Sequence, residues 1–352
     1  MRTQRWAAGA ALALGIAIGL PASGARASCV NPGGTDGCFA SVQAAVDAAA
    51  PREVISIEPG TYVENVVIGT GTRLTLQGAD AATTVLDGGA SGAVLSVTGP
   101  RTRVRVAGLR IQNGSASGIV AERARVRIER CLITGNSNSG AGGGVRDAGD
   151  RRARFEIAES SIVGNGAQRG GGIVFGGPSS VVLLRSTVSS NTASLDGGGI
   201  FAGNGRLRID SSTVSENAAP TWGGGVLVAA TKFGGARIRN STIAGNSAGT
   251  GSGGIYVLIG RVTLDSTIVA DNTAPDTPEC STGGFGPIRS RGFNLIEDPS
   301  GCDIAGRTDL DLVGVDPLLG PLQDNGGPTG GPAVQWGSPA LGAVTDARLF
   351  TT

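Results

Sequence analysis

A phrase of six residues that ends in asparagine recurs six times between residues 131 and 272. The copies read CLITGN, SSIVGN, STVSSN, STVSEN, STIAGN and TIVADN, and their asparagines are Asn136, Asn165, Asn191, Asn217, Asn246 and Asn272. The intervals between successive asparagines are 29, 26, 26, 29 and 26 residues. A fixed period in this range indicates a solenoid, in which each repeat is one unit that cannot bury its apolar face alone.

The residues before each asparagine fall into apolar columns separated by polar ones. The residue eight positions earlier is always Ile or Leu, the residue ten positions earlier is apolar in every copy, and a third aliphatic column lies three positions earlier. The column nine positions earlier is mostly polar, as at Arg127 and Glu156. This alternation predicts a β-strand with one buried face. A further aliphatic residue follows each run of glycines, at Val145, Ile173, Ile200, Val226 and Ile255.

Three short strands per repeat without a helical period leave few architectures. Antiparallel propeller blades need about forty residues or more per repeat, and leucine-rich repeats show a leucine-dominated pattern. The period therefore predicts an all-β fold, a parallel β-helix whose coils stack about 4.8 Å apart and place like residues over like.

Stacking of like residues gives the asparagine a structural reason. Its short amide tolerates the unusual backbone angles of a tight bend, and stacked copies can hydrogen-bond from coil to coil. Cys131 stands five residues before Asn136, in the column that Ser160 and Ser186 occupy in later copies. We therefore interpret Cys131 as a buried small residue rather than a nucleophile, since the sequence offers no histidine to activate a thiol.

The segments outside the repeat have the composition of caps. Residues 41–50, SVQAAVDAAA, predict a short amphipathic helix that closes the first coil, and the Pro/Gly-rich residues 273–352 predict a C-terminal cap. We interpret residues 28–352 as one domain. Residues 1–27 have the features of a secretory signal peptide, with Arg2 and Arg5 before an apolar run and cleavage expected after Ala27. Because that run is short and ends in Pro21, we expect no transmembrane segment in the mature chain.

Composition narrows the classes of function. The chain has 61 glycines in 352 residues and only 4% aromatic residues, which is typical of a turn-dense β protein. It has no histidine, which excludes a Ser-His-Asp triad, a histidine-ligated zinc and a histidine acid or base. The 29 basic and 28 acidic residues nearly cancel, so we expect no nucleic-acid partner.

Five cysteines indicate an oxidising compartment. Cys29 and Cys38 bracket one Gly-rich loop, and Cys280 and Cys302 bracket another, so we predict these two disulfides. Neither pair has metal-site spacing with partners, and no metal site is predicted. Export and disulfides together predict a secreted protein or one on the outer cell surface.

Longer phrases resemble known families. Residues 41–68, SVQAAVDAAAPREVISIEPGTYVENVVI, resemble the opening of secreted bacterial pectin-lyase-like proteins, which are right-handed parallel β-helices. The phrases STIVADNTAPDTPECS, GFNLIEDPSGC and TDLDLVGVDPLLGPLQDNGGPT resemble the end of the choice-of-anchor Q domain, and the glycine repeat resembles that of polymorphic outer-membrane proteins. The resemblance implies a right-handed helix in a bacterial extracellular setting, without an agreed activity. GGPAVQWGSPA replaces the Thr-His that family members tend to carry after NGGPT.

An enzymatic alternative is a polysaccharide lyase or glycoside hydrolase that acts on an acidic polysaccharide in an external groove. A lyase needs carboxylates for Ca²⁺ and an Arg or Lys as base. The column seven residues before the asparagine contains Asp210, Arg239 and Asp265 on successive coils, which are the candidate catalytic residues. The structural alternative is a surface charge ladder in which neighbours neutralise one another. Ca²⁺ is expected only under the lyase alternative, and no other cofactor is required.

A binding site is the second hypothesis. The outward residues after the glycines form a partly apolar ladder, which comprises Arg146, Val174, Phe201, Leu227 and Tyr256. Arg169, Asp196 and Trp222 lie in one register just before the glycines, a mixed cluster suited to a glycan. The candidate binding residues are therefore Arg169, Asp196, Trp222, Phe201 and Tyr256. We expect the C-terminal tail to fold back over Phe201 and Leu227.

A rigid extracellular spacer or adhesin is the third hypothesis, because a solenoid needs no ligand to be useful. Of the three, we expect a noncatalytic secreted or surface protein that binds an extracellular polysaccharide or a surface partner, or serves as an adhesin-like module.

Overall fold

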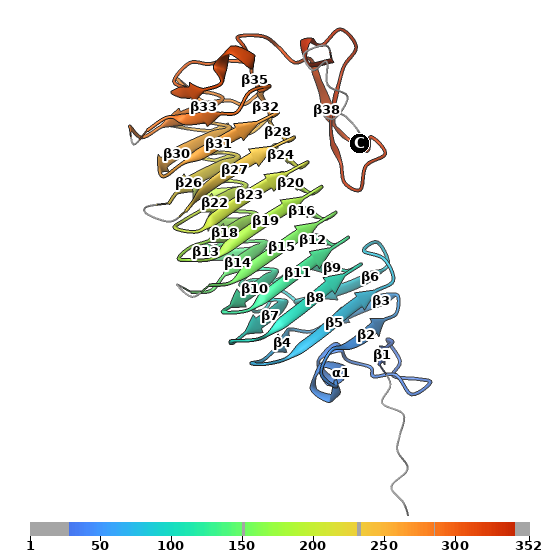
Figure 1. Ribbon diagram of the computed structural model, residues 1–352. Coiled ribbons are helices and arrows are strands. Elements are labelled where there is room, and N and C mark those ends of the chain that lie inside the picture. The colour runs from blue at the N-terminus through green and yellow to red at the C-terminus, as the bar shows by residue number, and fades with distance from the viewer. Residues whose placement is uncertain (1–27, 150–151, 231–233, 285, 342–352) are drawn as a thin grey trace, which may run out of the picture.

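The computed structural model describes residues 28–149, 152–230, 234–284 and 286–341, and it shows a parallel β-solenoid of about ten turns with one short α-helix (Figure 1). The predicted fold class is confirmed. The expected signal peptide, residues 1–27, lies outside the described residues.

Four stacks of parallel strands build the solenoid, and every strand pair within them is parallel. Sheet A contains β1 Cys29–Val30, β2 Glu53–Ile57, β5 Arg73–Gly78, β8 Arg103–Ala107, β11 Arg125–Glu129, β15 Arg154–Ala158, β19 Ser180–Leu184, β23 Arg206–Asp210, β27 Gly235–Arg239, β31 Val262–Asp265, β34 Ile288–Ser290 and β36 Ile304–Gly306. Sheet B contains β3 Gly60–Val63, β6 Thr84–Asp87, β9 Arg110–Gln112, β12 Leu132–Thr134, β16 Ser161–Val163, β20 Thr187–Ser189, β24 Thr213–Ser215, β28 Thr242–Ala244, β32 Ile268–Ala270, β35 Leu295–Ile296 and β37 Leu312–Val313.

Sheets C and D complete the coils. Sheet C contains β4 Val66–Ile68, β7 Leu95–Thr98, β10 Ile119–Glu122, β14 Val145–Asp147, β18 Ile173–Phe175, β22 Ile200–Ala202, β26 Val226–Ala229, β30 Ile255–Ile259 and β33 Cys280–Thr282. Sheet D is present only in the middle coils and contains β13 Ser137–Ala141, β17 Gly166–Arg169, β21 Thr192–Asp196, β25 Ala218–Ala219 and β29 Ser247–Ala248.

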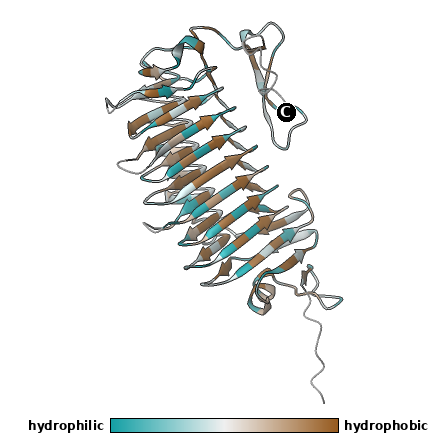
Figure 2. Ribbon diagram, in the orientation of Figure 1, coloured by the Kyte–Doolittle hydropathy of each residue, from teal (hydrophilic) through white to brown (hydrophobic). Residues whose placement is uncertain are grey.

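The predicted columns are the core. Leu183, Ile209 and Ile238 are in register on adjacent strands of sheet A and are all fully buried. Polar residues alternate with them, so hydrophilic and hydrophobic bands cross the strands (Figure 2). Each coil thus buries its apolar face against the next coil, which is the source of stability that one repeat lacks.

The asparagine column forms a continuous hydrogen-bonded ladder. The side-chain Nδ2 of Asn165 donates to Oδ1 of Asn191 at 3.0 Å, and Asn191 donates likewise to Asn217 at 2.9 Å. Each of these amides also donates to a backbone carbonyl of the previous coil, as Asn191 does to Ile162. The serine column forms a second ladder, and Cys131 begins it by donating its backbone N–H to the hydroxyl of Ser160.

The glycine triplets are explained by close contact between coils. The second glycine of each triplet packs closely against the next coil. At Gly198, for example, a Cβ would lie 2.5 Å from the carbonyl oxygen of Ala218, which leaves no room for a side chain. The third glycine lies against the ladder, since a Cβ on Gly199 would lie 2.9 Å from Nδ2 of Asn217. The first glycine, Gly197, has a φ of 64° and bends over the outward side chain of Phe201.

The N-terminal end is closed by α1, Val42–Ala48, which is the predicted capping helix. Its buried side chains, Val42, Ala45 and Val46, join the core. The Glu64 carboxylate accepts hydrogen bonds from the backbone N–H of Val42 and Gln43, which ties the helix start to the second coil. Both predicted disulfides are present, Cys29–Cys38 at this end and Cys280–Cys302 at the other.

The C-terminal segment first adds strands to the sheets and then leaves them. A 3₁₀ turn, Thr308–Leu310, and the short strand Leu312–Val313 come first. An antiparallel hairpin then turns back beside sheet B (Figure 1), and it consists of β38 Leu319–Gln323 and β39 Gly331–Val334. A last 3₁₀ turn spans Pro339–Leu341.

The hairpin contacts sheet B rather than the outward ladder of sheet C. Thr187 Oγ1 lies 2.9 Å from Thr329 Oγ1 and donates to the carbonyl of Gly330, while Ser215 lines a small space against Leu322. The described part of the tail, up to residue 341, therefore docks on sheet B and not over Phe201 and Leu227 as expected. The tail has no strand period of its own, and its docking place is decided by side-chain contacts that periodicity does not show.

Candidate anion-binding site

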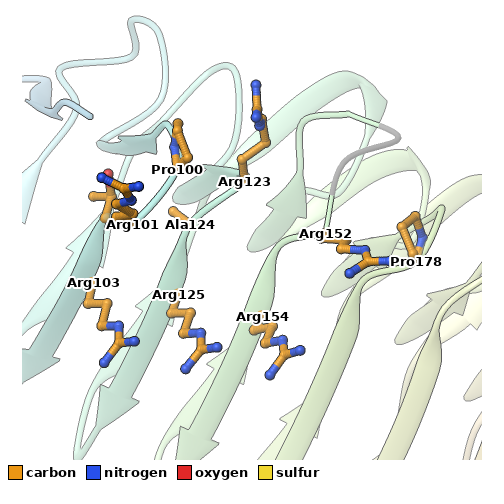
Figure 3. A pocket seen from close by; sticks show the side chains of 10 residues that line it. Pro100, Arg101, Arg103, Arg123, Ala124, Arg125, Arg152, Arg154 and Pro178 are labelled. Carbon is orange, nitrogen blue, oxygen red and sulfur yellow. The ribbon is translucent and has the colours of Figure 1, made fainter. Parts of the chain in front are cut away.

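The outer face of sheet A carries a column of arginines that the fold brings into register. Arg73 pairs with Arg103, Arg103 with Arg125, and Arg125 with Arg154, each on the next strand of the sheet. Neighbouring parallel strands lie about 4.8 Å apart, so the four side chains form one line along the helix axis. Figure 3 shows Arg103, Arg125 and Arg154 extending the same way from the beginnings of three adjacent strands.

Further arginines widen this column into a basic surface. Arg101, Arg123 and Arg152 stand at the turns that lead into the same strands (Figure 3). Two adjoining depressions of about 650 Å³ and about 830 Å³ share Arg103, Arg125 and Arg154 in their walls. We call Arg73, Arg103, Arg125 and Arg154, with the three turn arginines, the arginine column.

The middle of the arginine column is uncompensated. No acidic side chain of the described residues pairs with Arg103, Arg125 or Arg154, and all three are exposed. Two unit charges about 4 Å apart repel by about 1 kcal/mol in water. We therefore expect the column to lower the stability of the fold at low salt. A negatively charged ligand would remove this repulsion.

The neighbouring column in the same sheet behaves differently. Arg105 and Arg127 both bind the Glu129 carboxylate, and Arg127 lies 3.5 Å from Glu156. Burial would raise the pKa of Glu129, but hydrogen bonds from Arg105 and Arg127 outweigh it and lower that pKa. Glu129 is thus a fixed anion that aligns two arginines beside the column without neutralising the column itself.

The sequence-based candidates Asp210, Arg239 and Asp265 are adjacent, as expected, on β23, β27 and β31. Asp210 accepts hydrogen bonds from Arg208 at 2.7 Å and Arg239 at 2.9 Å, and is only 6% exposed. Arg237 lies 3.6 Å from Asp265. Two guanidinium groups thus cover the Asp210 carboxylate. The geometry is that of a charge ladder, and a catalytic role for the three residues stays a prediction.

The candidate binding residues lie where two sheets meet. Arg169 and Asp196 are in register on β17 and β21, with Arg169 Nε 3.2 Å from the carboxylate. Asp196 is 8% exposed rather than facing freely outward, because Arg169 and Thr221 bind it. Trp222 and Tyr256 stack on each other.

Phe201, Leu227 and Tyr256 are in register on sheet C, as expected, but they do not form an open ladder. Leu227 is 1% exposed and Phe201 is half-buried. The bend before each glycine triplet covers them, since a Cβ on Gly223 would lie 2.9 Å from Cβ of Leu227. Trp222 is the most exposed apolar residue of this surface, at 37%.

The sequence-based prediction missed the arginine column because it took the charge balance over the whole chain. Residues 101–154 carry twelve basic and four acidic residues, whereas residues 273–341 carry three basic and nine acidic ones. Arginine also recurs eleven residues before the asparagines, at Arg125, Arg154, Arg206 and Arg261. This position lies two residues before the polar column that contains Arg127. A local charge count would have found the site.

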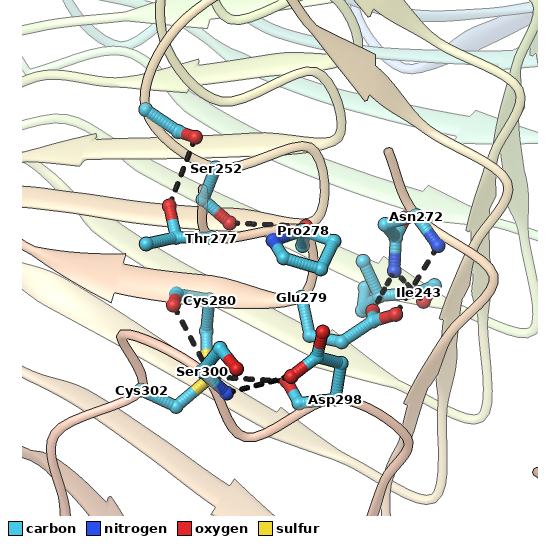
Figure 4. The surroundings of a disulfide bond; sticks show 11 residues. Ile243, Ser252, Asn272, Thr277, Pro278, Glu279, Cys280, Asp298, Ser300 and Cys302 are labelled. Carbon is cyan, nitrogen blue, oxygen red and sulfur yellow. Dashed lines mark hydrogen bonds between the residues drawn. A yellow bond between two sulfur atoms is a disulfide. The ribbon is translucent and has the colours of Figure 1, made fainter. Parts of the chain in front are cut away.

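A buried carboxylate ends the asparagine ladder at the other end of the molecule (Figure 4). Glu279 is 2% exposed, precedes the Cys280–Cys302 disulfide, and accepts hydrogen bonds from both the side chain and the backbone N–H of Asn272. Burial raises the pKa of Glu279 to about 8, against the opposing effect of the Asn272 hydrogen bonds. It replaces the amide that a further coil would supply.

The described part of the chain offers no group of three or more His, Cys, Asp or Glu side chains arranged to hold a metal ion. None of the helices in the described ranges has the length and apolar character needed to cross a membrane.

Comparison with solved structures agrees with the fold. A pectate lyase, Pel9A, superposes with a TM-score of 0.52 at 16% identity, covering 80% of this chain and 78% of the lyase. The alginate lyase from Paenibacillus sp. str. FPU-7 gives 0.45 at 16% identity, with 77% and 96% coverage, and the pectin methylesterase from Aspergillus niger gives 0.41 at 16% identity, with 82% and 86% coverage. At 16% identity the likeness to Pel9A concerns the fold alone.

Sequence comparison identifies the family of this chain. No curated protein sequence matches this chain. The profile described as the right handed beta helix region matches residues 93–274, which is more than half of the chain and includes Arg103, Arg125 and Arg154. The chain therefore belongs to the right-handed β-helix family.

Proposed function

We propose that this protein binds an anionic extracellular polysaccharide along the arginine column of sheet A, without cleaving it. The observation that carries the proposal is the line of in-register arginines, of which Arg103, Arg125 and Arg154 have no acidic partners in the described residues. A linear polymer with one carboxylate or sulfate per sugar presents its charges at regular intervals, and an array spaced by the strands can meet several of them at once.

The choice of arginine suits carboxylate ligands. Of the 29 basic residues in the chain, 28 are arginine. The planar guanidinium donates two parallel hydrogen bonds to a carboxylate or sulfate and is more weakly hydrated than an ammonium group. Depth is not required, because a polymer gains affinity from repeated contacts along a shallow surface.

A polysaccharide fits this surface better than a nucleic acid. Surfaces for single-stranded nucleic acids combine basic residues with aromatic rings on which bases stack. The walls of the two depressions contain one aromatic residue, Phe155, and it is buried in the core. Sugars need no such stacking partner when their charged groups supply the contact.

The extracellular setting belongs to the same proposal. Two disulfides in the described chain are typical of exported proteins. The resemblance of residues 1–27 to a signal peptide and of the C-terminal phrases to the choice-of-anchor Q domain supports a secreted or surface location, in which acidic polysaccharides are available as partners.

The proposal is tested by measuring the affinity of the protein for polygalacturonate and for alginate by calorimetry at several salt concentrations. We expect R103Q/R125Q/R154Q to bind at least 10-fold more weakly than the wild type. The slope of log K against the logarithm of the salt concentration is also expected to become shallower, by at most about 0.7 for each charge removed. The matched control is R185Q, since Arg185 is an exposed arginine that pairs with Glu159 away from the column.

Three outcomes would contradict the proposal. Equal affinity of the triple variant and the wild type would exclude the arginine column as the site. Binding of single-stranded DNA in place of both polysaccharides would assign a nucleic-acid ligand. Growth of unsaturated-uronide absorbance in the same samples would establish the lyase alternative, and D210N and R239Q would then show whether those residues act in catalysis.

A further inference from the structure

A stacked aromatic pair lies at the bend that leads into sheet C, away from the arginine column. Trp222 directly precedes Gly223, and Tyr256 lies on β30 in the next coil. Their ring centroids are 5.6 Å apart and their planes differ by 10°. Trp222 is 37% exposed although the other apolar residues of this surface are buried or half-buried. Tyr256 covers one face of the indole, so the exposed part of Trp222 consists of its other face and its edges.

A glycine makes this stack feasible. Gly251 occupies the position of Trp222 in the following coil and has a φ of 63°. A Cβ at Gly251 would lie 2.6 Å from Cδ1 of Trp222 and 3.1 Å from Cδ2 of Tyr256. The indole therefore lies across the space of a missing side chain, and the two coils hold the rings as one rigid platform.

Polar groups border the platform in the same column. The carbonyl of Trp222 accepts the backbone N–H of Gly197, which places Asp196 one coil away, and Arg169 lies one coil further. The Arg169 side chain is 51% exposed while Asp196 neutralises it. Thr250 is exposed beside Thr221, to whose carbonyl its hydroxyl donates at 3.2 Å. From Trp222 to Arg169 the surface extends over about 10 Å, two strand spacings.

We propose that the Trp222–Tyr256 platform is a binding site for an uncharged sugar chain, in which the C–H face of one pyranose ring stacks on the indole. Sugars present an apolar C–H face and hydroxyl groups at the ring edge, and this surface offers a π face beside a guanidinium and a hydroxyl. The pairing of Arg169 with Asp196 leaves no net charge to select a charged ligand. The site is independent of the arginine column, and each can fail without the other.

The three tryptophans of the chain make a site-specific test available. In the chain carrying W6F and W336F, Trp222 is the only tryptophan and reports on its own surroundings by fluorescence. Cellohexaose and xylohexaose, both uncharged, are titrated in 0.5 M NaCl, which suppresses binding that depends on charge. We expect a saturable change in the emission of Trp222 with at least one of them.

Calorimetry with otherwise unaltered chains supplies the matched variants. W222A is expected to bind the same oligosaccharide at least 10-fold more weakly, W222F to retain intermediate affinity, and R103Q/R125Q/R154Q to bind as the wild type does. The control chain W6F/W222F keeps Trp336, which is 95% exposed, and its emission is expected to stay constant. Absence of a saturable change with both oligosaccharides, an equal change in the control chain, or loss of binding in the triple arginine variant would each overturn the proposal.

Discussion

Replacing Arg125 with glutamine is expected to stabilise the folded protein at low salt. Arg125 lies between Arg103 and Arg154 in register, and none of the three has an acidic partner among the described residues. Each neighbouring pair repels by up to about 1 kcal/mol in water, so R125Q relieves at most about 2 kcal/mol. Glutamine keeps much of the side-chain length and has no charge, which leaves the strand and the buried column behind it unchanged.

Salt dependence separates this electrostatic effect from any change in packing. The screening length is about 30 Å at 0.01 M salt and about 3 Å at 1 M, which is less than the spacing of two strands. In urea unfolding followed by circular dichroism, R125Q is expected to have the higher midpoint at 0.01 M salt and the wild-type midpoint at 1 M. The same stabilisation at both salt concentrations would point to packing instead.

The control uses an arginine of the same sheet that has a partner. Arg208 Nη2 donates to Asp210 Oδ2 at 2.7 Å, and Asp210 is nearly buried. R208Q removes an attraction rather than a repulsion, and because Arg208 is about half exposed we expect a loss of no more than about 1 kcal/mol. Destabilisation by R125Q at 0.01 M salt, as large as that by R208Q, would refute the account of the arginine column as an uncompensated charge array.

Three further predictions concern the ladders. E279Q is expected to remove a pH dependence of the free energy of unfolding. Because the folded-state pKa of Glu279 is raised from 4.5 to about 8, the wild type loses stability as the pH rises between these values. The melting temperature of E279Q is expected to stay level over the same pH range. N191A removes the acceptor of the backbone N–H of Asn165, one of the three acceptors of Asn165 Nδ2, and the side-chain donor to the carbonyl of Ile162. It is expected to lose about 2 kcal/mol in urea unfolding, chiefly through the buried N–H of Asn165, and a loss below about 1 kcal/mol would show that the ladder is dispensable. C131S is expected to be nearly neutral in the same assay, because a hydroxyl extends the serine ladder, and the wild-type thiol is expected to resist a thiol reagent at pH 8, since burial raises the pKa of Cys131 to about 11.

The repeat predicted those contacts in which residues of the same type lie against each other in successive coils. Ile128 and Ile157 lie in register because the period repeats them, and the amide of Asn165 meets that of Asn191 for the same reason. A column of equal residues is visible in the sequence as soon as the period is known. The core and the ladders were therefore predictable from the period. The capping helix was predictable from the amphipathic pattern of residues 41–50, and both disulfides from the positions of the cysteines.

The features that escaped prediction depend on contacts between unlike segments. The strands of sheet D, such as β13 Ser137–Ala141, show no alternation of apolar residues and are strands because the next coil supplies partners for their backbone. The hairpin docks on Thr187 through residues more than 140 positions away in the sequence. The covering of Leu227 by the bend at Gly223 needs a φ of 65° that the sequence does not show.

A comparison of the two halves of sheet A supports the proposal that the arginine column serves a ligand. Beyond Arg154 the column passes to Ser180, and the outer face of β23, β27 and β31 carries paired charges, such as Asp210 with Arg239 and Arg237 with Asp265. Both halves use the same parallel register and the same buried columns, so the fold accepts paired charges, neutral residues or unpaired arginines equally well. Stability alone would favour the paired arrangement throughout, because unpaired like charges one strand apart repel. Among the described residues, Arg103, Arg125 and Arg154 are arginines without acidic partners that lie in register on three adjacent strands, and this is where we expect a polyanion to bind along the axis.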